Sequence, residues 1–296
     1  MTITKPAPQA STWRIQRYLK KLPGKVILYS LMLLFSAIFS LPLIWLVSTS
    51  LKTGAEAFRI PPNLIPDPVV WSNYIKGLSY LPFGKYILNT FTIAIPRIVG
   101  SVIVCAVVAY GFSRIEWDGR DGLFFVCVAT MIIPYAVTMI PLYLLFNRLG
   151  WVGGYLPLII PSFFGEPYFI FLLRQFFMGI PQELSDAARV DGCSEIMIFI
   201  KIILPLSKPA LAMVALFTFM GTWGDYLGPL IYLNDPDKYT VSLALYQFGA
   251  NWRGSNLDRY TWFMASISAM TLPVLLLFFL VQRTFIEGIS LTGLKG

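Results

Sequence analysis

The sequence contains no histidine, and only 13% of its 296 residues are charged. Without histidine the chain lacks the commonest zinc ligand and every serine–histidine or cysteine–histidine nucleophile. Its charge is far below the roughly 25% of an ordinary soluble domain. The three cysteines, Cys105, Cys127 and Cys193, stand far apart and form neither a CxxC pair nor a disulfide framework. No catalytic constellation or metal site is visible, which argues against a membrane enzyme.

Apolar residues dominate the chain instead. Hydrophobic residues make up 56% of it and aromatic residues 16%, and its mean hydropathy is +0.68. A hydrocarbon core about 30 Å thick needs roughly 20 apolar residues in a helix. Six segments meet that requirement: about 26–49, 86–112, 123–146, 155–179, 202–231 and 261–282. We therefore expect an all-α integral membrane protein whose six transmembrane helices form one domain, 26–282.

The distribution of Lys and Arg predicts the side of the membrane on which each end lies. Segment 1–25 carries six basic residues: Lys5, Arg14, Arg17, Lys20, Lys21 and Lys25. Cytoplasmic segments are enriched in Lys and Arg, so 1–25 and the tail 283–296 are expected in the cytoplasm. Loop 181–201 is then cytoplasmic as well, and 51–85 and 232–260 are external. The net charge of +8 reflects this topology, and no nucleic-acid partner is expected.

Loop 181–201 begins with residues that predict a short helix and a sharp turn. Pro181 suits a helix start, and Glu183 and Asp186 would lie in the first turn, where the helix dipole favours acids. Gly192 suits a left-handed turn at the end of the helix. Four acids against one Arg give residues 181–195 a charge of −3. An anionic leaflet repels such a helix, so a groove in a partner protein is the better surface for it.

The residues after this turn predict a return into the membrane. Ser194 can cap a second helix, with Glu195 in its first turn. Pro205 follows near the start of the fifth span and should bend it. We therefore expect a short helix, a turn and a bent re-entry.

The same stretch resembles the cytoplasmic EAA loop of ABC importer permeases, whose pattern is E-A-A-x3-G-x9-I-x-L-P. Here the pattern reads Asp186, Ala187, Ala188, then Gly192, then Ile202, Leu204 and Pro205, with every spacing kept and Asp in place of the usual Glu. STSLKTGAEAF (48–58), TWGDYLGPLIYL (222–233) and the terminal QRTFIEGISLTGLKG (282–296) are also similar to maltose-type sugar permeases.

The resemblance implies the type I fold of an ABC importer permease, a transport subunit of the bacterial cytoplasmic (inner) membrane without enzymatic activity. In such systems two permease subunits form the pathway for a sugar, oligosaccharide or sugar derivative. Two copies of a separate ATPase, which bind ATP and magnesium, dock on the EAA loops, and an external solute-binding protein delivers the solute. This chain itself needs no cofactor. The resemblance assigns ATPase coupling to Glu183, Asp186, Ala187, Ala188, Asp191, Gly192, Leu204 and Pro205.

Charged residues inside the spans are candidates for the solute pathway. Arg97, Glu166 and Asp225 are costly in lipid unless they face protein or water. Trp223 and Tyr226 flank Asp225 and can stack on the face of a sugar. We therefore expect Glu166, Trp223, Asp225 and Tyr226 on the pathway. Interhelical pairing of the charges, and an interfacial belt for the aromatic residues, are the alternative roles.

Two other classes of transporter stay open. An ABC importer for a non-sugar solute, such as glycerol phosphate or a polyamine, shares the loop and differs only in the cavity. An ion-coupled secondary transporter would use the charges within the spans for proton or sodium coupling, but it gives no reason for the acidic loop.

Overall fold

A computed structural model describes residues 10–251 and 256–292, with the side chains of 24–251 and 256–282. Its regular structure within these ranges is entirely helical. Four stretches are long and apolar enough to cross a membrane: Gly24–Ser50, Phe83–Ser113, Leu156–Met178 and Leu257–Gln282. Two bent pairs of helices bring the number to six if each pair is one span: Arg120–Ile132 with Tyr135–Arg148, and Glu195–Leu206 with Lys208–Gly224. The all-α membrane fold is confirmed, and the six predicted segments fall on these stretches in order, except that the fifth ends at Gly224, before its predicted end at 231, so Asp225 lies beyond it.

Helix α4 (Phe83–Ser113) lies at the centre of the bundle. It packs against α8 (Pro167–Met178) and α12 (Lys208–Gly224), and α12 packs in turn against α15 (Leu257–Thr292). Small residues permit this close packing. At Gly100 a Cβ atom would lie only 2.9 Å from the Ser162 Oγ. The part of the fourth span that contains Ser162 therefore packs directly on the backbone of α4.

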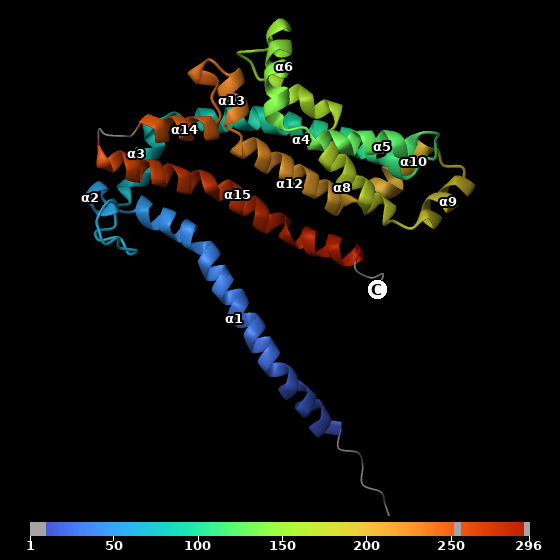
Figure 1. Cartoon of the computed structure of the whole chain (residues 1–296), viewed down its shortest axis with the longest axis horizontal. Helices are drawn as coiled ribbons and strands as arrows, with labels where there is room; N and C mark the ends of the chain where they lie inside the picture. Colours follow the sequence, from blue (N-terminus) through green and yellow to red (C-terminus); the bar gives the residue numbers. More distant parts are fainter. Residues whose placement is uncertain (1–9, 252–255, 293–296) are drawn as a thin grey trace, which may run out of the picture.

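Helix α1 (Ala10–Ser50) diverges from the bundle along most of its length (Figure 1). Its residues 24–44 are all exposed, whereas its last three residues are buried, and it contacts α15. The short helices α2 (Gly54–Ala57) and α3 (Ser72–Tyr80) follow it. They lie at the same end of the molecule as α14 (Val241–Asn251).

The third predicted span is sharply bent, a feature that the apolar pattern did not predict. The span consists of α5 (Arg120–Ala129), η1 (Thr130–Ile132) and α6 (Tyr135–Arg148), with a bend of 96°. Ile133 is extended at the bend, with φ −75° and ψ 114°. It precedes Pro134, and the proline ring disfavours helical backbone in the residue before it. As a result α6 projects away from the bundle, at a steep angle to α4 (Figure 1).

The fifth span has the predicted bend, displaced by two residues. It begins as α10 (Glu195–Ile198), the π-helix η3 (Phe199–Ile203) and α11 (Leu204–Leu206), and turns by 77° into α12. The bend lies at Ser207, between Pro205 and Pro209. Each of these prolines removes a backbone donor from the helical ladder.

The remaining helices complete the fourth span, follow the fifth span, or project from one end of the bundle. The fourth span is assembled from α7 (Leu156–Ile159), the 3₁₀ helix η2 (Ile160–Phe164) and α8, and α13 (Leu227–Tyr232) and η4 (Pro236–Lys238) follow the fifth. Helix α9 (Gln182–Val190) projects from the end opposite to α3 (Figure 1). The N-terminal end of α1 and the C-terminal end of α15 both point toward the α9 end. This agrees with the predicted common side, although the sidedness and the domain boundaries stay predictions.

Candidate functional site

Helix α9 has one face against the protein and one face free. It begins after Pro181, whose backbone is extended (ψ 132°). Glu183 lies in its first turn as predicted, whereas Asp186, also predicted there, lies in the next turn because the helix begins at Gln182. Ser185 and Ala188 are buried against the bundle. Glu183, Asp186 and Ala187 are exposed. The short acidic helix predicted from the sequence is confirmed, and an acidic surface faces outward.

The turn after α9 has the predicted geometry. Gly192 adopts φ +80°, the left-handed region, and exposed Asp191 precedes it. The Cys193 N–H donates to the Ala188 carbonyl at 2.9 Å, which ends the helix. The Ser194 Oγ then accepts from the Met197 N–H at 3.3 Å as the N-cap of α10. The helix, the turn and the cap therefore form one continuous hydrogen-bonded unit.

A chain of polar contacts links α9 to α4. The Tyr110 hydroxyl donates to Glu195 Oε2 at 2.6 Å. Arg189 donates through Nε to Glu195 Oε1 and through Nη1 to Asp186 Oδ1, both at 2.7 Å. Hydrogen bonding to Glu195 and Asp186 raises the pKa of Arg189 above its ordinary value. The aspartate that stands at the usual glutamate position of the loop pattern is therefore tied to the bundle.

Arg114 holds the corner between α8 and α9. Its side chain is only 5% exposed and donates to the carbonyls of Phe177 and Ile180 and, at 2.6 Å, to Gln182 Oε1. Burial lowers the pKa of this guanidinium. Arg114 was not identified from the sequence as a functional residue. Its position directly after a long apolar helix could have marked it as a residue at the end of a span. Its role could not be predicted, because its acceptors are more than 60 residues away in the chain.

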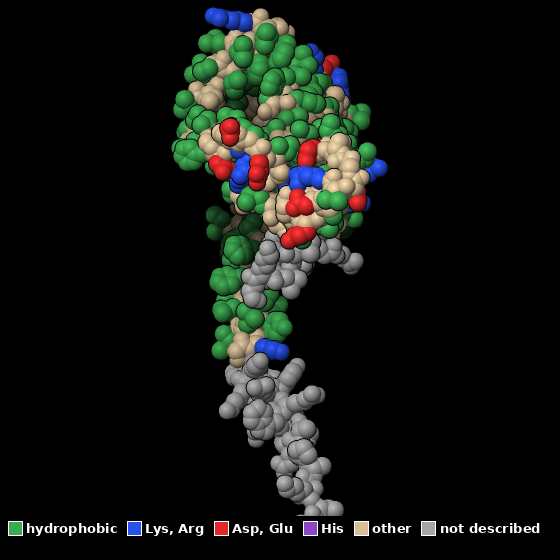
Figure 2. Space-filling model, turned by 90° about the vertical axis from the view of Figure 1, so that its right-hand side faces the viewer, with side chains coloured by type: hydrophobic (Ala, Val, Ile, Leu, Met, Phe, Trp, Pro, Cys, Tyr) green, Lys and Arg blue, Asp and Glu red, His purple; other side chains and the backbone are tan. Residues whose placement is uncertain are grey.

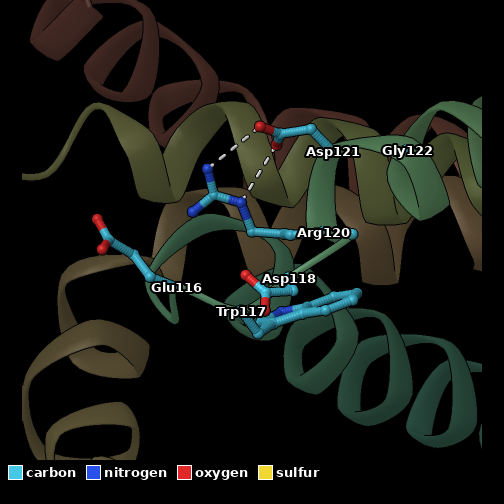
Figure 3. A pocket seen from close by; sticks show the side chains of 7 residues that line it. Glu116, Trp117, Asp118, Arg120, Asp121 and Gly122 are labelled. Atoms are coloured by element: carbon cyan, nitrogen blue, oxygen red, sulfur yellow. Dashed lines mark hydrogen bonds and ion pairs between the residues drawn. The ribbon is translucent and has the colours of Figure 1, made fainter.

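The connection between α4 and α5 lies beside this unit and adds further charge. It surrounds an open surface cavity of about 490 Å³ lined by 116–122. Arg120 points toward Asp121 there (Figure 3), with Nε 3.2 Å from Oδ1. Arg174 of α8 approaches the same carboxylate at 3.4 Å. Viewed from the α9 end, acidic side chains gather around basic ones on this face (Figure 2).

Leu204 and Pro205 lie behind α9 at the start of the bent fifth span. Leu204 is partly buried and packs against the core cluster that α4, α8 and α12 share, whereas Pro205 is exposed. The Leu204 N–H donates to Phe199 O, five residues back, which is the π-helical step before the proline. The uninterrupted helical segment α10–η3–α11 therefore connects both residues to the turn that ends α9.

The predicted pathway residues are dispersed rather than gathered. Glu166 lies between η2 and α8 and accepts from the Ser101 hydroxyl of α4 at 3.0 Å. Trp223 is buried, stacks on Phe219 and donates its indole N–H to Met270 O at 3.1 Å. Tyr226 stacks on Tyr246, with ring centroids 5.1 Å apart.

Asp225 lines a cavity within the membrane-spanning region. It lies in the extended link between α12 and α13, and its Oδ1 accepts from the Gly228 N–H at 3.0 Å. The cavity measures about 280 Å³, and Arg97, Tyr135 and Tyr232 share its wall. The sequence marked Arg97 as a charge within a span but did not place it with Asp225. Within the described ranges, no group of three or more Cys, Asp or Glu side chains could hold a metal ion.

Comparison with known proteins gives a consistent family. Residues 102–290 match the model of the binding-protein-dependent transport system inner membrane component. The arabinooligosaccharides transport system permease protein AraQ of Halalkalibacterium halodurans is 34% identical over 270 residues, which are 88% of this chain and 92% of AraQ.

Two solved structures share the fold. The structure of a bacterial ABC transporter involved in the import of the acidic polysaccharide alginate matches with a TM-score of 0.77 and 24% identity, over 94% of this chain and 99% of that one. A bacterial alginate ABC transporter in complex with an alginate pentasaccharide-bound periplasmic protein matches with a TM-score of 0.62 and 18% identity, over 90% and 96%.

Proposed function

Since this chain belongs to the family of binding-protein-dependent transport system inner membrane components, we propose that it is the permease subunit through which an ATP-driven importer moves a sugar, oligosaccharide or sugar derivative. It is a multi-pass protein of the bacterial inner membrane and a transport subunit. The name of the AraQ relative supports an oligosaccharide as the solute.

The proposed coupling rests on one observation: α9 exposes an acidic face, and its opposite side is hydrogen-bonded to the bundle. Arg114 fixes the corner where α9 begins, and the Tyr110–Glu195–Arg189–Asp186 contacts fix its far end. Because α9 is fixed at both ends, a displacement of α9 moves the neighbouring helices with it as a rigid body. A separate ATPase, which binds ATP and magnesium, docks on this face, and its closure moves α9 together with α8 and the bent fifth span.

The transport cycle then needs no covalent chemistry in this chain. Movement of α9 reorients the spans around the cavity, so the pathway opens outward to a solute-loaded binding protein. Such alternating access is driven by ligands with different affinity for the two states. A second permease subunit completes the pathway, and two copies of the ATPase serve the two permeases.

Reconstitution tests this function directly. The chain is copurified with its partner permease and ATPase, placed in liposomes, and supplied with ATP inside and solute-loaded binding protein outside. We expect uptake of labelled oligosaccharide and a rise in ATP hydrolysis when the loaded binding protein is added. The chain purified alone should hydrolyse no ATP. ATP hydrolysis by the single chain, or uptake driven by a proton or sodium gradient without ATP, would refute the proposal, and the second result would favour a secondary transporter.

A further inference from the structure

Arg97 is a cation near the middle of the membrane-spanning helix α4. It lies roughly 21 Å of helix rise from Phe83 and about 24 Å from Ser113. Its Nε is buried without a hydrogen-bond partner, and it forms no ion pair with any described residue. A cation at this depth is tolerated only where it faces protein or water. A hydrogen-bond acceptor for the Arg97 guanidinium therefore has to come from water, a ligand or another chain.

The cavity beside Arg97 lies where three spans lose regular helix. Tyr135 begins α6 directly after the 96° bend, Pro161 lies in the 3₁₀ turn η2, and Asp225 lies in the link between α12 and α13. Irregular backbone at membrane depth is stable only when it is buried in protein or lines a water-filled cavity. These three breaks border one cavity of about 280 Å³, which is the arrangement expected of a wet site.

The two charged groups of this cavity differ in how far they are satisfied. Asp225 accepts from the Gly228 N–H, but it forms no ion pair with Arg97. The Arg97 Nε has no acceptor, and the guanidinium forms no ion pair within the described part of the chain. A guanidinium prefers a carboxylate, which it binds through two parallel hydrogen bonds. The missing group is therefore an anion.

The rest of the wall suits a carbohydrate. Tyr135, Phe146 and Tyr232 present aromatic rings to the cavity, and such rings pack on apolar C–H faces while the tyrosine hydroxyls form hydrogen bonds. The volume is just below the roughly 300–1,000 Å³ of sites that enclose drug-sized ligands. The cavity therefore admits one sugar unit of a longer chain.

We propose that Arg97 binds the carboxylate of an acidic sugar unit, so the transported carbohydrate carries carboxylate groups. This inference rests on the proposed function in sugar import and adds the charge of the solute. A sugar phosphate fits less well, because the site offers a single cation with the Asp225 carboxylate in the same wall, and a phosphate near neutral pH carries more than one negative charge.

Binding of charged and neutral forms of one oligosaccharide tests this assignment. The complete complex is placed in lipid nanodiscs, and its affinity is measured for trigalacturonate, for the trimethyl ester of trigalacturonate and for glucose 6-phosphate. We expect the complex to bind the acid more tightly than the ester by roughly tenfold or more, the factor that corresponds to about 1.4 kcal/mol. Arg97→Gln should reduce affinity for the acid to that for the ester, and Arg97→Lys should retain part of the preference.

Arg148→Gln is the matched control, because Arg148 is exposed at the end of α6 and does not line the cavity. It should keep the full preference for the acid. Equal binding of acid and ester, absence of binding, or tighter binding of glucose 6-phosphate would overturn the inference. An equal loss of acid and ester in Arg97→Gln would also overturn it. If Arg97→Gln alone fails to copurify with the second permease, Arg97 has its counter-charge on that chain and the inference is wrong.

The two proposals fail in different ways. A complex that takes up neutral oligosaccharide with ATP, yet does not distinguish acid from ester, refutes only the role of Arg97. A complex that shows no ATP-driven uptake of any oligosaccharide refutes the proposed function itself.

Discussion

Gly192 adopts a backbone conformation that side chains oppose. Its φ of +80° lies in the left-handed region, and a Cβ atom there would meet no atom within 4 Å. The cost of substitution therefore comes from the backbone and not from crowding. For residues with a side chain that cost is roughly 1–2 kcal/mol, and a β-branched side chain is among the least suited. This turn sets the direction in which α9 projects.

Gly192→Val should leave membrane insertion intact and abolish transport, because the strained turn displaces α9 from the ATPase. Gly192→Asn is the matched control, since Asn tolerates the left-handed region and should keep most of the activity. Uptake into proteoliposomes and copurification of the ATPase are the two measurements. Normal transport by the valine variant with the ATPase still bound would show that α9 does not dock it.

Asp225 combines a charge in the cavity with a structural hydrogen bond to Gly228. We expect Asp225→Ala to lower transport or to alter its dependence on solute concentration, because both roles are lost. Asp225→Asn keeps an acceptor for the Gly228 N–H and removes only the charge, so it separates the two roles. Uptake is measured across the solute concentration range. Wild-type behaviour of Asp225→Asn together with a loss in Asp225→Ala would assign Asp225 to the hydrogen bond alone, and wild-type behaviour of both variants would remove Asp225 from the transport pathway.

At the scale of elements, α9 depends on a residue outside it. Arg114 joins the ends of α4 and α8 to the start of α9 through three acceptors. Replacing it removes three hydrogen bonds from a charged donor, and hydrogen bonds to charged groups contribute roughly 1.5–3 kcal/mol each. The elements on either side of this corner therefore move as one body only while Arg114 is present.

Arg114→Met should reduce the stimulation of ATP hydrolysis by solute-loaded binding protein several-fold and lower the melting temperature of the complex. Arg120→Met is the control, because Arg120 pairs with a largely exposed Asp121 and exposed pairs contribute little. ATPase assays with and without binding protein measure the first effect. Full stimulation in the methionine variant would remove Arg114 from the coupling path.

Some elements could be predicted from local sequence and others could not. The α9 helix, its Gly192 turn and the Ser194 cap depend on residues within a few positions of one another, and all were predicted. The 96° bend at Ile133 was missed, because the apolar run on both sides of Pro134 has the pattern of one continuous span. The bend near Pro205 was predicted, but its position depends on Pro209 as well.

At the scale of the whole molecule, the cavity was beyond sequence reasoning. Arg97, Tyr135 and Asp225 lie on three different spans and meet only after those spans are bent and packed. The same packing removes Trp223 from the pathway candidates that face this cavity, because its indole is buried against α15. Local spacing carries no information about such contacts, whereas membrane class, span order and the loop pattern are local and were predicted.

The Arg189 bridge has a consequence for how the assembled transporter responds to salt. By neutralising Asp186 and Glu195 internally, it leaves Glu183 and Asp191 as the acids of 181–195 without a basic partner in the described chain. These two lie roughly 12 Å apart along the helix, which exceeds the Debye length of about 8 Å at physiological ionic strength. They therefore act on a partner as two separate single charges, and we expect contact with the proposed ATPase to depend on shape more than on attraction between charges.

Raising the salt concentration from about 0.15 M to about 1 M should therefore change the affinity of the ATPase for the permease pair by less than about tenfold. Arg189→Gln releases two carboxylates and should make that dependence steeper. Sedimentation or surface-binding measurements over this range compare the two proteins. If the wild type already dissociates steeply with salt, the helix attracts its partner from a distance and this expectation is wrong.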